Sequence, residues 1–441
     1  MSITFDDIKL SKQLRSALAD QNITVPTRIQ ERAIPAILSG KDVVGIAQTG
    51  TGKTLAYLLP ILRDLKYSDQ RPPRVLILVP TRELVVQVAS EIEKLTSHIS
   101  LRTLSVYGGT NINTQKQAIY DGCDILVATP GRLYDLTMTG ILRLKDVRKL
   151  VIDECDEMLD LGFRPQLERI LELLPNKRQN LMFSATITEN VDALVQTFFS
   201  ETEHILAAPK GTPLENIKQK VFAVPNYNTK LNFLIELLKS EDEFEKVFVF
   251  VKSKSMADRL HDALETEFPE TFGVLHSNKS QNYRLRMVEE FKDGSLRGLV
   301  ATDLVSRGID IDNITHVINF DIPNQVEQYI HRIGRTGRVD KDGTAISFVS
   351  EKEMPYFDGI LGYMKIDLEI SSLPDNIEVS TELIPEEEEI DIHAAPTLSD
   401  KKHAVGDGPK DAVSKKIKKT YNLKPRQKNK KVRKGRKNKK R

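Results

Sequence analysis

The 441-residue sequence contains no tryptophan and only two cysteines, and aromatic residues make up 6% of it. Cys123 and Cys155 are too few for a disulfide framework or for a zinc site of their own. No apolar run approaches the roughly 18 residues needed to span a bilayer. The first residues also lack the basic and apolar regions of a secretory signal. We therefore expect a reduced, cytoplasmic chain that does not cross a membrane.

Hydrophobic residues make up 40% of the chain and charged residues 29%, as in soluble globular proteins. At about 150 residues per domain, the length predicts two or three domains. Charge is uneven: residues 401–441 hold 19 Lys and Arg against two Asp, a net of +17, whereas the whole chain carries only +2. This basic tail predicts a polyanionic partner, most simply nucleic acid, and the alternative is a solvated tail that aids solubility.

Three short apolar sequences recur in the same order in the two halves of the chain. Residues 75–79 pair with 247–251, 126–129 with 299–302, and 150–153 with 316–319. These segments have the length of strands, and helix-period segments alternate with them. The repetition predicts two copies of one α/β unit, each a doubly wound parallel sheet with helices on both faces.

Composition also predicts the domain boundaries. We expect a first domain over residues 1–207, a linker rich in proline and glycine at 208–213, and a second domain over 214–365. An acidic extension follows at 366–395, and its run of glutamates, 386–389, has no assigned role. The Lys/Arg-rich tail, residues 396–441, offers too little apolar area to order itself, so we expect it to be disordered.

The sharpest chemical signal is the sequence Ala-Gln-Thr-Gly-Thr-Gly-Lys-Thr at residues 47–54, between an apolar strand and a helical segment. It predicts a phosphate-binding loop, although the usual pattern begins with glycine. Glycines bring backbone N–H groups close to phosphates, and the helix amino terminus favours negative charge. We expect Lys53 to reach the β- and γ-phosphates and the Thr54 hydroxyl to bind Mg²⁺.

Two adjacent carboxylates, Asp153 and Glu154, end the strand-like segment 150–152. At such a strand end Asp153 can hold the Mg²⁺ shell, and Glu154 can orient and deprotonate an attacking water. The next residue, Cys155, has no Cys or His nearby in sequence, so we interpret it as a small buried spacer.

The third signal is His-Arg-Ile-Gly-Arg-Thr-Gly-Arg at residues 331–338. Three arginines among glycines are not expected in a packed core. Arginine fingers that reach a γ-phosphate from the second unit would explain them, and a solvated basic turn is the alternative. Because Lys53 lies in the first unit, we expect ATP to bind between the units and to control their closure.

In these motifs and their order, the sequence resembles the DEAD-box family of ATP-dependent RNA helicases over roughly residues 5–350. Phe5 and residues 26–30 resemble the adenine-reading Q motif, and 47–54, 80–84, 108–109, 128–132, 153–156 and 184–186 resemble motifs I to III. In the second half, 248–254, Gln281 with Arg284, 301–310 and 331–338 resemble motifs IV to VI. The flanks look most like those of the bacterial RhlE-type branch.

The resemblance implies tandem RecA-like domains, ATP and Mg²⁺ as cofactors, and a set of functional residues. Catalysis would use Lys53, Asp153, Glu154, Arg335 and Arg338, and Mg²⁺ would be bound by Thr54 and Asp153. The nucleotide would also contact Ile23, Arg28, Gln30, Gln48, Thr49, Gly50, Thr51, Gly52, Lys53, Thr54 and Asp310. RNA would contact Arg82, Gly108, Gly109, Thr129, Arg132, Lys252, Gln281, Arg284, Thr302 and Arg307. Asp156, Ser184, Thr186 and His331 would couple the two sites.

Two departures from the family pattern matter. The second motif reads Asp-Glu-Cys-Asp instead of Asp-Glu-Ala-Asp, and because its acids are intact we expect hydrolysis to be retained. Ile23 stands where the family usually has an aromatic residue that stacks on adenine. Our hypothesis is that adenine is held less tightly here and that Gln30 carries more of the selectivity.

The expected function is RNA-stimulated ATP hydrolysis, coupled to closure of the two domains on RNA. Closure would locally unwind short duplexes or remodel RNA–protein complexes, through contacts with phosphates and sugars that do not read sequence. A DNA-dependent motor and an ATP-dependent RNA clamp remain as alternatives. A signalling GTPase is disfavoured because no Asn-Lys-x-Asp motif is present. We expect a monomer, with ribosome-assembly or RNA-decay proteins as candidate partners.

Overall fold

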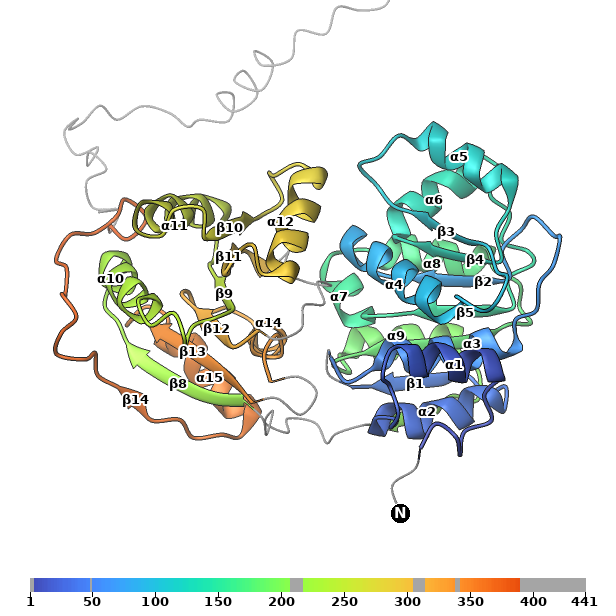
Figure 1. Ribbon diagram of the computed structural model, residues 1–441, viewed down its shortest axis with the longest axis horizontal. Coiled ribbons are helices and arrows are strands. Elements are labelled where there is room, and N and C mark those ends of the chain that lie inside the picture. Colours follow the sequence, from blue (N-terminus) through green and yellow to red (C-terminus); the bar gives the residue numbers. More distant parts are fainter. Residues whose placement is uncertain (1–3, 48–49, 207–216, 304–313, 338–341, 389–441) are drawn as a thin grey trace, which may run out of the picture. The chain divides into compact units, whose positions relative to one another are not determined.

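The computed structural model of the chain describes residues 4–47, 50–206, 217–303, 314–337 and 342–388. These residues build two seven-stranded parallel sheets with helices on both faces, which confirms the predicted fold class (Figure 1). In the described part of the chain, no helix has the length and apolar character needed to cross a membrane.

The first sheet has the strand order β3-β4-β2-β5-β6-β1-β7. Its strands are β1 (Val43–Ile46), β2 (Val75–Leu78), β3 (Thr103–Val106), β4 (Ile125–Ala128), β5 (Lys149–Ile152), β6 (Gln179–Ser184) and β7 (Glu203–Leu206). Its helices are α1 (Lys12–Asp20), α2 (Arg28–Leu38), α3 (Lys53–Asp64), α4 (Arg82–Leu95), α5 (Ile112–Asp121), α6 (Pro130–Met138), α7 (Cys155–Asp160), α8 (Arg164–Leu173) and α9 (Glu189–Phe198). Alternate strand residues point to opposite faces. One face packs against α1 to α4 and the other against α5 to α9.

The second sheet repeats this order as β10-β11-β9-β12-β13-β8-β14. Its strands are β8 (Ile217–Ala223), β9 (Val247–Phe250), β10 (Phe272–Leu275), β11 (Gly298–Ala301), β12 (His316–Asn319), β13 (Gly343–Val349) and β14 (Ile370–Ser371). Its helices are α10 (Tyr227–Leu238), α11 (Lys254–Glu267), α12 (Gln281–Asp293), α14 (Val326–Ile333) and α15 (Met354–Met364).

The repeated sequences occupy equivalent strands in the two sheets. β2 corresponds to β9, β4 to β11 and β5 to β12 when the two strand orders are aligned. All these strands are buried except for the first residue of β5. A strand buried on both faces needs a continuous apolar sequence, which is why the repetition is visible in the sequence. The prediction of two copies of one α/β unit is confirmed.

Residues 366–387 form an ordered segment that we call the strap. It adds β14 in parallel to β8 at the edge of the second sheet. Beyond β14, Ile377 and Ile384 are buried in the core under α10 and α11. Asparagine side chains at the start of α10 donate hydrogen bonds to backbone carbonyls of the strap. Asn226 donates to Ser380 O at 2.7 Å, and Asn228 donates to Glu382 O at 2.9 Å. The predicted acidic extension is therefore packed on the second sheet as far as residue 387.

Two glutamates of the run 386–389 connect the end of the strap to α10 and α11. Glu386 forms an ion pair of 3.0 Å with Arg259 of α11. The backbone N–H of Tyr227, the first residue of α10, donates to Glu387 Oε1 at 2.7 Å. A carboxylate at a helix amino terminus is stabilised by the exposed N–H groups and the helix dipole. These contacts give a structural role to residues whose sequence suggested none.

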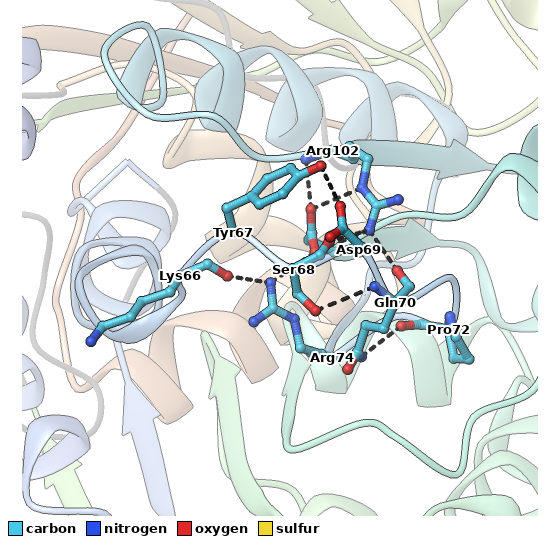
Figure 2. Close-up of polar contacts among 9 residues, drawn as sticks. Lys66, Tyr67, Ser68, Asp69, Gln70, Pro72, Arg74 and Arg102 are labelled. Atoms are coloured by element: carbon cyan, nitrogen blue, oxygen red, sulfur yellow. Dashed lines mark hydrogen bonds and ion pairs between the residues drawn. The ribbon is translucent and has the colours of Figure 1, made fainter.

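At the amino-terminal ends of β2, β3 and β4, a buried carboxylate organises the loop between α3 and β2 (Figure 2). Asp124 accepts hydrogen bonds from Arg74 at 2.8 Å and from Arg102 Nε at 3.2 Å. Arg102 also donates to the carbonyls of Ser68 and Gln70. Burial alone would raise the pKa of Asp124, but Arg102 and Arg74 hold it below its ordinary value. This cluster stabilises the end of the sheet opposite the phosphate-binding loop.

We expect His316, the first residue of β12, to make the stability of the second domain sensitive to acid. Its ring stacks on Phe244 with centroids 4.1 Å apart, and burial lowers its pKa to about 4. Between pH 6.5 and 4 the unfolded chain binds a proton that the folded chain excludes, so stability falls as the pH falls. We expect a loss of about 1 kcal/mol after allowance for solvent screening. Urea unfolding at pH 7 and pH 5 should show a smaller loss for His316→Phe, and equal losses would contradict this assignment.

Candidate functional site

The phosphate-binding loop connects β1 to α3. Gly50 and Gly52 have φ angles of 82° and 86°, in the left-handed region that favours glycine. Gly52 is also the N-cap of α3, and a Cβ there would lie 2.3 Å from Gln30 Nε2. Thr51 is half-buried beside it. The predicted contacts Gln48 and Thr49 lie outside the described residues.

A buried ion pair joins this loop to the end of β5. Lys53 Nζ lies 2.8 Å from Glu154 Oε2, and the two side chains are 5% and 9% exposed. Burial alone would lower the pKa of Lys53, but the charges of Glu154, Asp153 and Asp156 outweigh it, so the pKa is raised. Lys53 therefore keeps its positive charge at neutral pH, among three carboxylates.

Asp153 follows β5 directly and has a donor on each oxygen. Oδ2 accepts a hydrogen bond from the Tyr57 hydroxyl at 2.9 Å, and Oδ1 accepts one from the Glu154 N–H at 3.0 Å. Burial and the charge of Glu154 raise the pKa of Asp153 to about 6. Its carboxylate and the Thr54 hydroxyl are hard oxygen donors of the kind Mg²⁺ takes. The residues present therefore fit magnesium.

Glu154 has φ 51°, a left-handed conformation that few residues other than glycine adopt. It is the N-cap of α7, so the chain turns sharply between strand and helix at the predicted catalytic base. Backbone strain of this kind persists where surrounding contacts fix it, and it is common at functional sites. The next residue, Cys155, is fully buried and burial raises the pKa of its thiol, which confirms the interpretation of Cys155 as a buried spacer.

The predicted coupling residues of the first domain lie in one hydrogen-bonded cluster. Asp156 Oδ2 accepts bonds from the backbone N–H and the hydroxyl of Thr186, both at 2.8 Å. The Asp156 N–H donates to Ser184 Oγ at 3.2 Å. Burial alone would raise the pKa of Asp156, but His331, Lys53 and these hydroxyls lower it. The contacts connect α7 with the segment that follows β6.

The Q-motif residues are attached to the phosphate-binding loop. Gln30 is buried; its Oε1 accepts from the Thr27 N–H at 2.9 Å and its Nε2 donates to Gly52 O at 3.0 Å. Arg28 is exposed at the start of α2. Ile23 is half-buried and packs on the core of the first domain. These contacts show that Gln30 bridges the two segments predicted to bind nucleotide, a structural role that the sequence analysis did not anticipate.

The predicted RNA contacts of the first domain follow the ends of β2, β3 and β4. Gly109 has φ 82°, and a Cβ there would lie 2.1 Å from the guanidinium of Arg82. Gly108 lies beside the same guanidinium, so the glycine pair makes room for it. Thr129 occupies the N-cap position of α6 without a side-chain capping bond. Arg132 donates to Gln115 at 2.8 Å and to the carbonyl of Thr110.

In the second domain, Lys252 and Thr302 follow β9 and β11 and line one pocket. Gln281 and Arg284 of α12 both contact Glu83 Oε1 of α4, at 2.9 Å and 2.5 Å. Glu83 is a buried carboxylate that sequence reasoning missed, because nothing in its local sequence indicates these distant partners. The predicted residues Arg307, Asp310 and Arg338 lie outside the described residues.

The basic segment that begins with His331 is partly a core element. Arg332 is 2% exposed and forms a bidentate ion pair with Asp303. Its Nε and Nη2 donate to the two carboxylate oxygens at 2.6 and 2.7 Å. The expectation that none of the three arginines is packed in a core is therefore wrong for Arg332, because Asp303 and the carbonyl of Asp321 satisfy its charge. Arg335 is also buried and donates to the carbonyl of His331. His331 Nε2 lies 3.9 Å from Asp156 Oδ2.

Comparison with known proteins identifies the family. The DEAD/DEAH box helicase family matches residues 27–194, and the helicase conserved C-terminal domain matches residues 229–340. The DEAD-box ATP-dependent RNA helicase CshA of Bacillus cereus is 40% identical over 350 residues, which are 79% of this chain and 66% of that protein. CshA of Geobacillus kaustophilus is 39% identical over 80% of this chain and 74% of its own length. The RhlE-type branch is not confirmed.

Among solved structures, Saccharomyces cerevisiae Dbp5 bound to RNA and ADP BeF3 matches with a TM-score of 0.77. It is 28% identical and covers 84% of this chain and 95% of that one. The chain spans 66% of the length of the B. cereus relative, and about a third of that protein lies outside the match. On the matching motifs, sheets and relatives together, this chain belongs to the DEAD-box family of ATP-dependent RNA helicases.

Proposed function

We propose that the protein hydrolyses ATP in response to RNA and uses domain closure to unwind short duplexes or to remodel RNA–protein complexes. The observation that carries this proposal is the buried cluster of Lys53, Asp153 and Glu154, at the ends of β1 and β5. Carboxyl ends of parallel strands are where α/β sheets bind ligands. Relatives named as ATP-dependent RNA helicases support the same reaction.

Each residue of the cluster has a proposed role. Lys53 binds the β- and γ-phosphates. Thr54 and Asp153 would hold Mg²⁺, which would neutralise phosphate charge. Glu154 orients the attacking water and accepts its proton. On nucleotide binding Lys53 exchanges its contact with Glu154 for phosphate oxygens, and Glu154 then acts as the base. Arg335 and Arg338 stabilise the charge that develops on the transferred phosphoryl group.

RNA is bound through phosphates and sugars. The proposed contacts are arginines, a lysine, glycines, a glutamine and threonine hydroxyls, which position a strand without reading its sequence. A Dbp5 structure described as bound to RNA and ADP BeF3 supports RNA as the ligand. The hydrogen bonds of Asp156 with Ser184 and Thr186 support the proposal that these residues couple the catalytic cluster to RNA binding.

The deciding experiment is steady-state ATP hydrolysis without nucleic acid, with single-stranded RNA, and with DNA of matched length and sequence. We expect strong stimulation by RNA alone. Stimulation by DNA would favour the DNA-dependent motor. Equal activity in all three conditions would contradict coupling to RNA and favour an RNA clamp.

The basic tail is proposed to add RNA affinity that does not depend on sequence. If about six of its charges contact phosphates, the slope of log affinity against log salt should steepen by about four for single strands. We therefore expect deletion of residues 396–441 to flatten that slope, measured by fluorescence anisotropy from 50 to 300 mM salt. A tail of equal length with its Lys and Arg changed to Gln is the matched control. An unchanged slope in both variants would show that the tail makes no phosphate contacts.

The predicted domain boundaries, a monomeric state and a cytoplasmic location remain part of the proposal, as do ribosome-assembly or RNA-decay proteins as partners. The packing of the strap on β8 and α10 favours a second domain that continues to residue 387. Limited proteolysis would test this boundary, since cleavage between residues 365 and 376 should be slow in the folded chain.

A further inference from the structure

Tyr57 is a buried tyrosine whose ring and hydroxyl have different neighbours. It lies one turn after Lys53 on α3 and is fully buried. The ring packs against Phe183 of β6, with centroids 5.3 Å apart, inside the core of the first domain. A phenylalanine would fill the same apolar space, so the ring alone does not explain why the residue is a tyrosine.

The hydroxyl is used at the nucleotide site. It donates to Asp153 Oδ2 at 2.9 Å. Thr54, the other residue proposed to bind magnesium, lies three residues before Tyr57 on the same helix, α3. The Glu154 N–H holds the other oxygen of Asp153 at 3.0 Å.

These two donors fix the plane of the Asp153 carboxylate. Each oxygen accepts one protein hydrogen bond and keeps further acceptor positions for a ligand, because an ionised carboxylate has about four lone-pair sites. A carboxylate held in this way loses less freedom when it binds a cation. Groups that orient a metal ligand commonly change metal affinity by about 10- to 100-fold when they are removed.

We propose that Tyr57 is a positioning residue, whose hydroxyl orients Asp153 for the magnesium ion that accompanies the nucleotide. The proposal rests on the function proposed above and adds a residue to it. The side chain does not contact the nucleotide in this scheme, so its effect should be confined to the magnesium dependence of binding.

Tyr57→Phe removes the hydroxyl and keeps the ring. The measurement is binding of a fluorescent ADP analogue to the full chain at increasing Mg²⁺, and again in EDTA. We expect the Mg²⁺ concentration for half-maximal binding to rise roughly 10-fold, while affinity in EDTA stays within about twofold of wild type. A merely structural role would instead weaken binding in both conditions.

Two further variants sharpen the test. Tyr329→Phe is the matched control, because Tyr329 is a buried tyrosine of the second domain whose hydroxyl donates to Gln219 at 3.0 Å. It should leave the Mg²⁺ dependence unchanged. In a double-mutant cycle, Tyr57→Phe should add nothing once Asp153 is changed to Ala, since its effect acts through that carboxylate.

The outcomes separate this proposal from the function on which it rests. If wild type requires Mg²⁺ and Tyr57→Phe has the same requirement within twofold, the hydroxyl does not position Asp153 and the proposal is overturned. An additive effect of the two substitutions would also overturn it. If wild-type binding is indifferent to Mg²⁺, the magnesium site itself is wrong, and both proposals fall together.

Discussion

Changing Glu154 to Gln should reduce the rate of ATP hydrolysis on the order of 10²- to 10⁴-fold, the usual contribution of a positioned general base. Glutamine has nearly the same shape and keeps an oxygen that can accept the hydrogen bond from Lys53, which lies 2.8 Å from Glu154 Oε2. It cannot take a proton from water. Binding of ATP and RNA should therefore be retained while turnover stops, and single-turnover hydrolysis with saturating RNA would measure the difference.

The chain offers a matched control for this variant. Glu203 also pairs with a lysine, Lys41, at 2.9 Å, but these side chains are 40% and 58% exposed. Glu203→Gln removes one carboxylate of a lysine pair in the same domain and should leave hydrolysis unchanged, because exposed pairs contribute about 0–1 kcal/mol. Turnover by Glu154→Gln within threefold of wild type would show that another group accepts the proton.

Replacement of Lys53 by Ala should weaken nucleotide binding itself. Hydrogen bonds to charged groups contribute about 1.5–3 kcal/mol, which corresponds to a loss of roughly 10- to 150-fold in affinity for ATP. The same change also removes the ion pair of Lys53 with Glu154, whose side chain is 9% exposed. Titration of a fluorescent ATP analogue, after a thermal melt has verified folding, would measure the effect.

Lys41→Ala is the corresponding control, since Lys41 is 58% exposed at its side chain. It should change neither the affinity for ATP nor the melting temperature by more than a small amount. Equal affinities for Lys53→Ala and wild type would remove the phosphate-binding role of Lys53. A loss of affinity in both lysine variants would indicate a general electrostatic effect of the domain surface.

Much of the fold could be predicted because its strands are short, buried and repeated. Residues 126–129 and 299–302 have the same sequence, and they form most of two equivalent strands, β4 and β11, each followed by a threonine. The phosphate-binding loop and the acids after β5 were also predictable, because a local pattern fixes both their backbone and their chemistry. Three observed contacts, Lys53 with Glu154 and Asp156 with Ser184 and Thr186, bring these predicted residues together.

The rest depends on contacts between distant residues. Arg332 can be buried because it pairs with Asp303, 29 residues earlier. No pattern in the sequence around Arg332 predicts this ion pair. The strap has apolar residues at 377 and 384, with no strand or helix period, and its order comes from side-chain amides of α10. The sequence around Tyr57 predicts only a core residue of an amphipathic helix. The hydrogen bond of its hydroxyl to Asp153, at 2.9 Å, is visible only in the structure.

The carboxylate of Glu387 has a consequence for stoichiometry. α10 follows β8 as α3 follows β1, so its amino terminus is the position in the second sheet where a phosphate group would bind in the first. Glu387 Oε1 already accepts a hydrogen bond from the Tyr227 N–H there. Asn226 Oδ1 accepts one from the Thr229 N–H at 2.9 Å. Among the described residues, the duplicated fold thus pairs the proposed nucleotide site of the first sheet with an equivalent position in the second that the chain's own carboxylate occupies. Each chain should bind a single nucleotide, with a Hill coefficient of one.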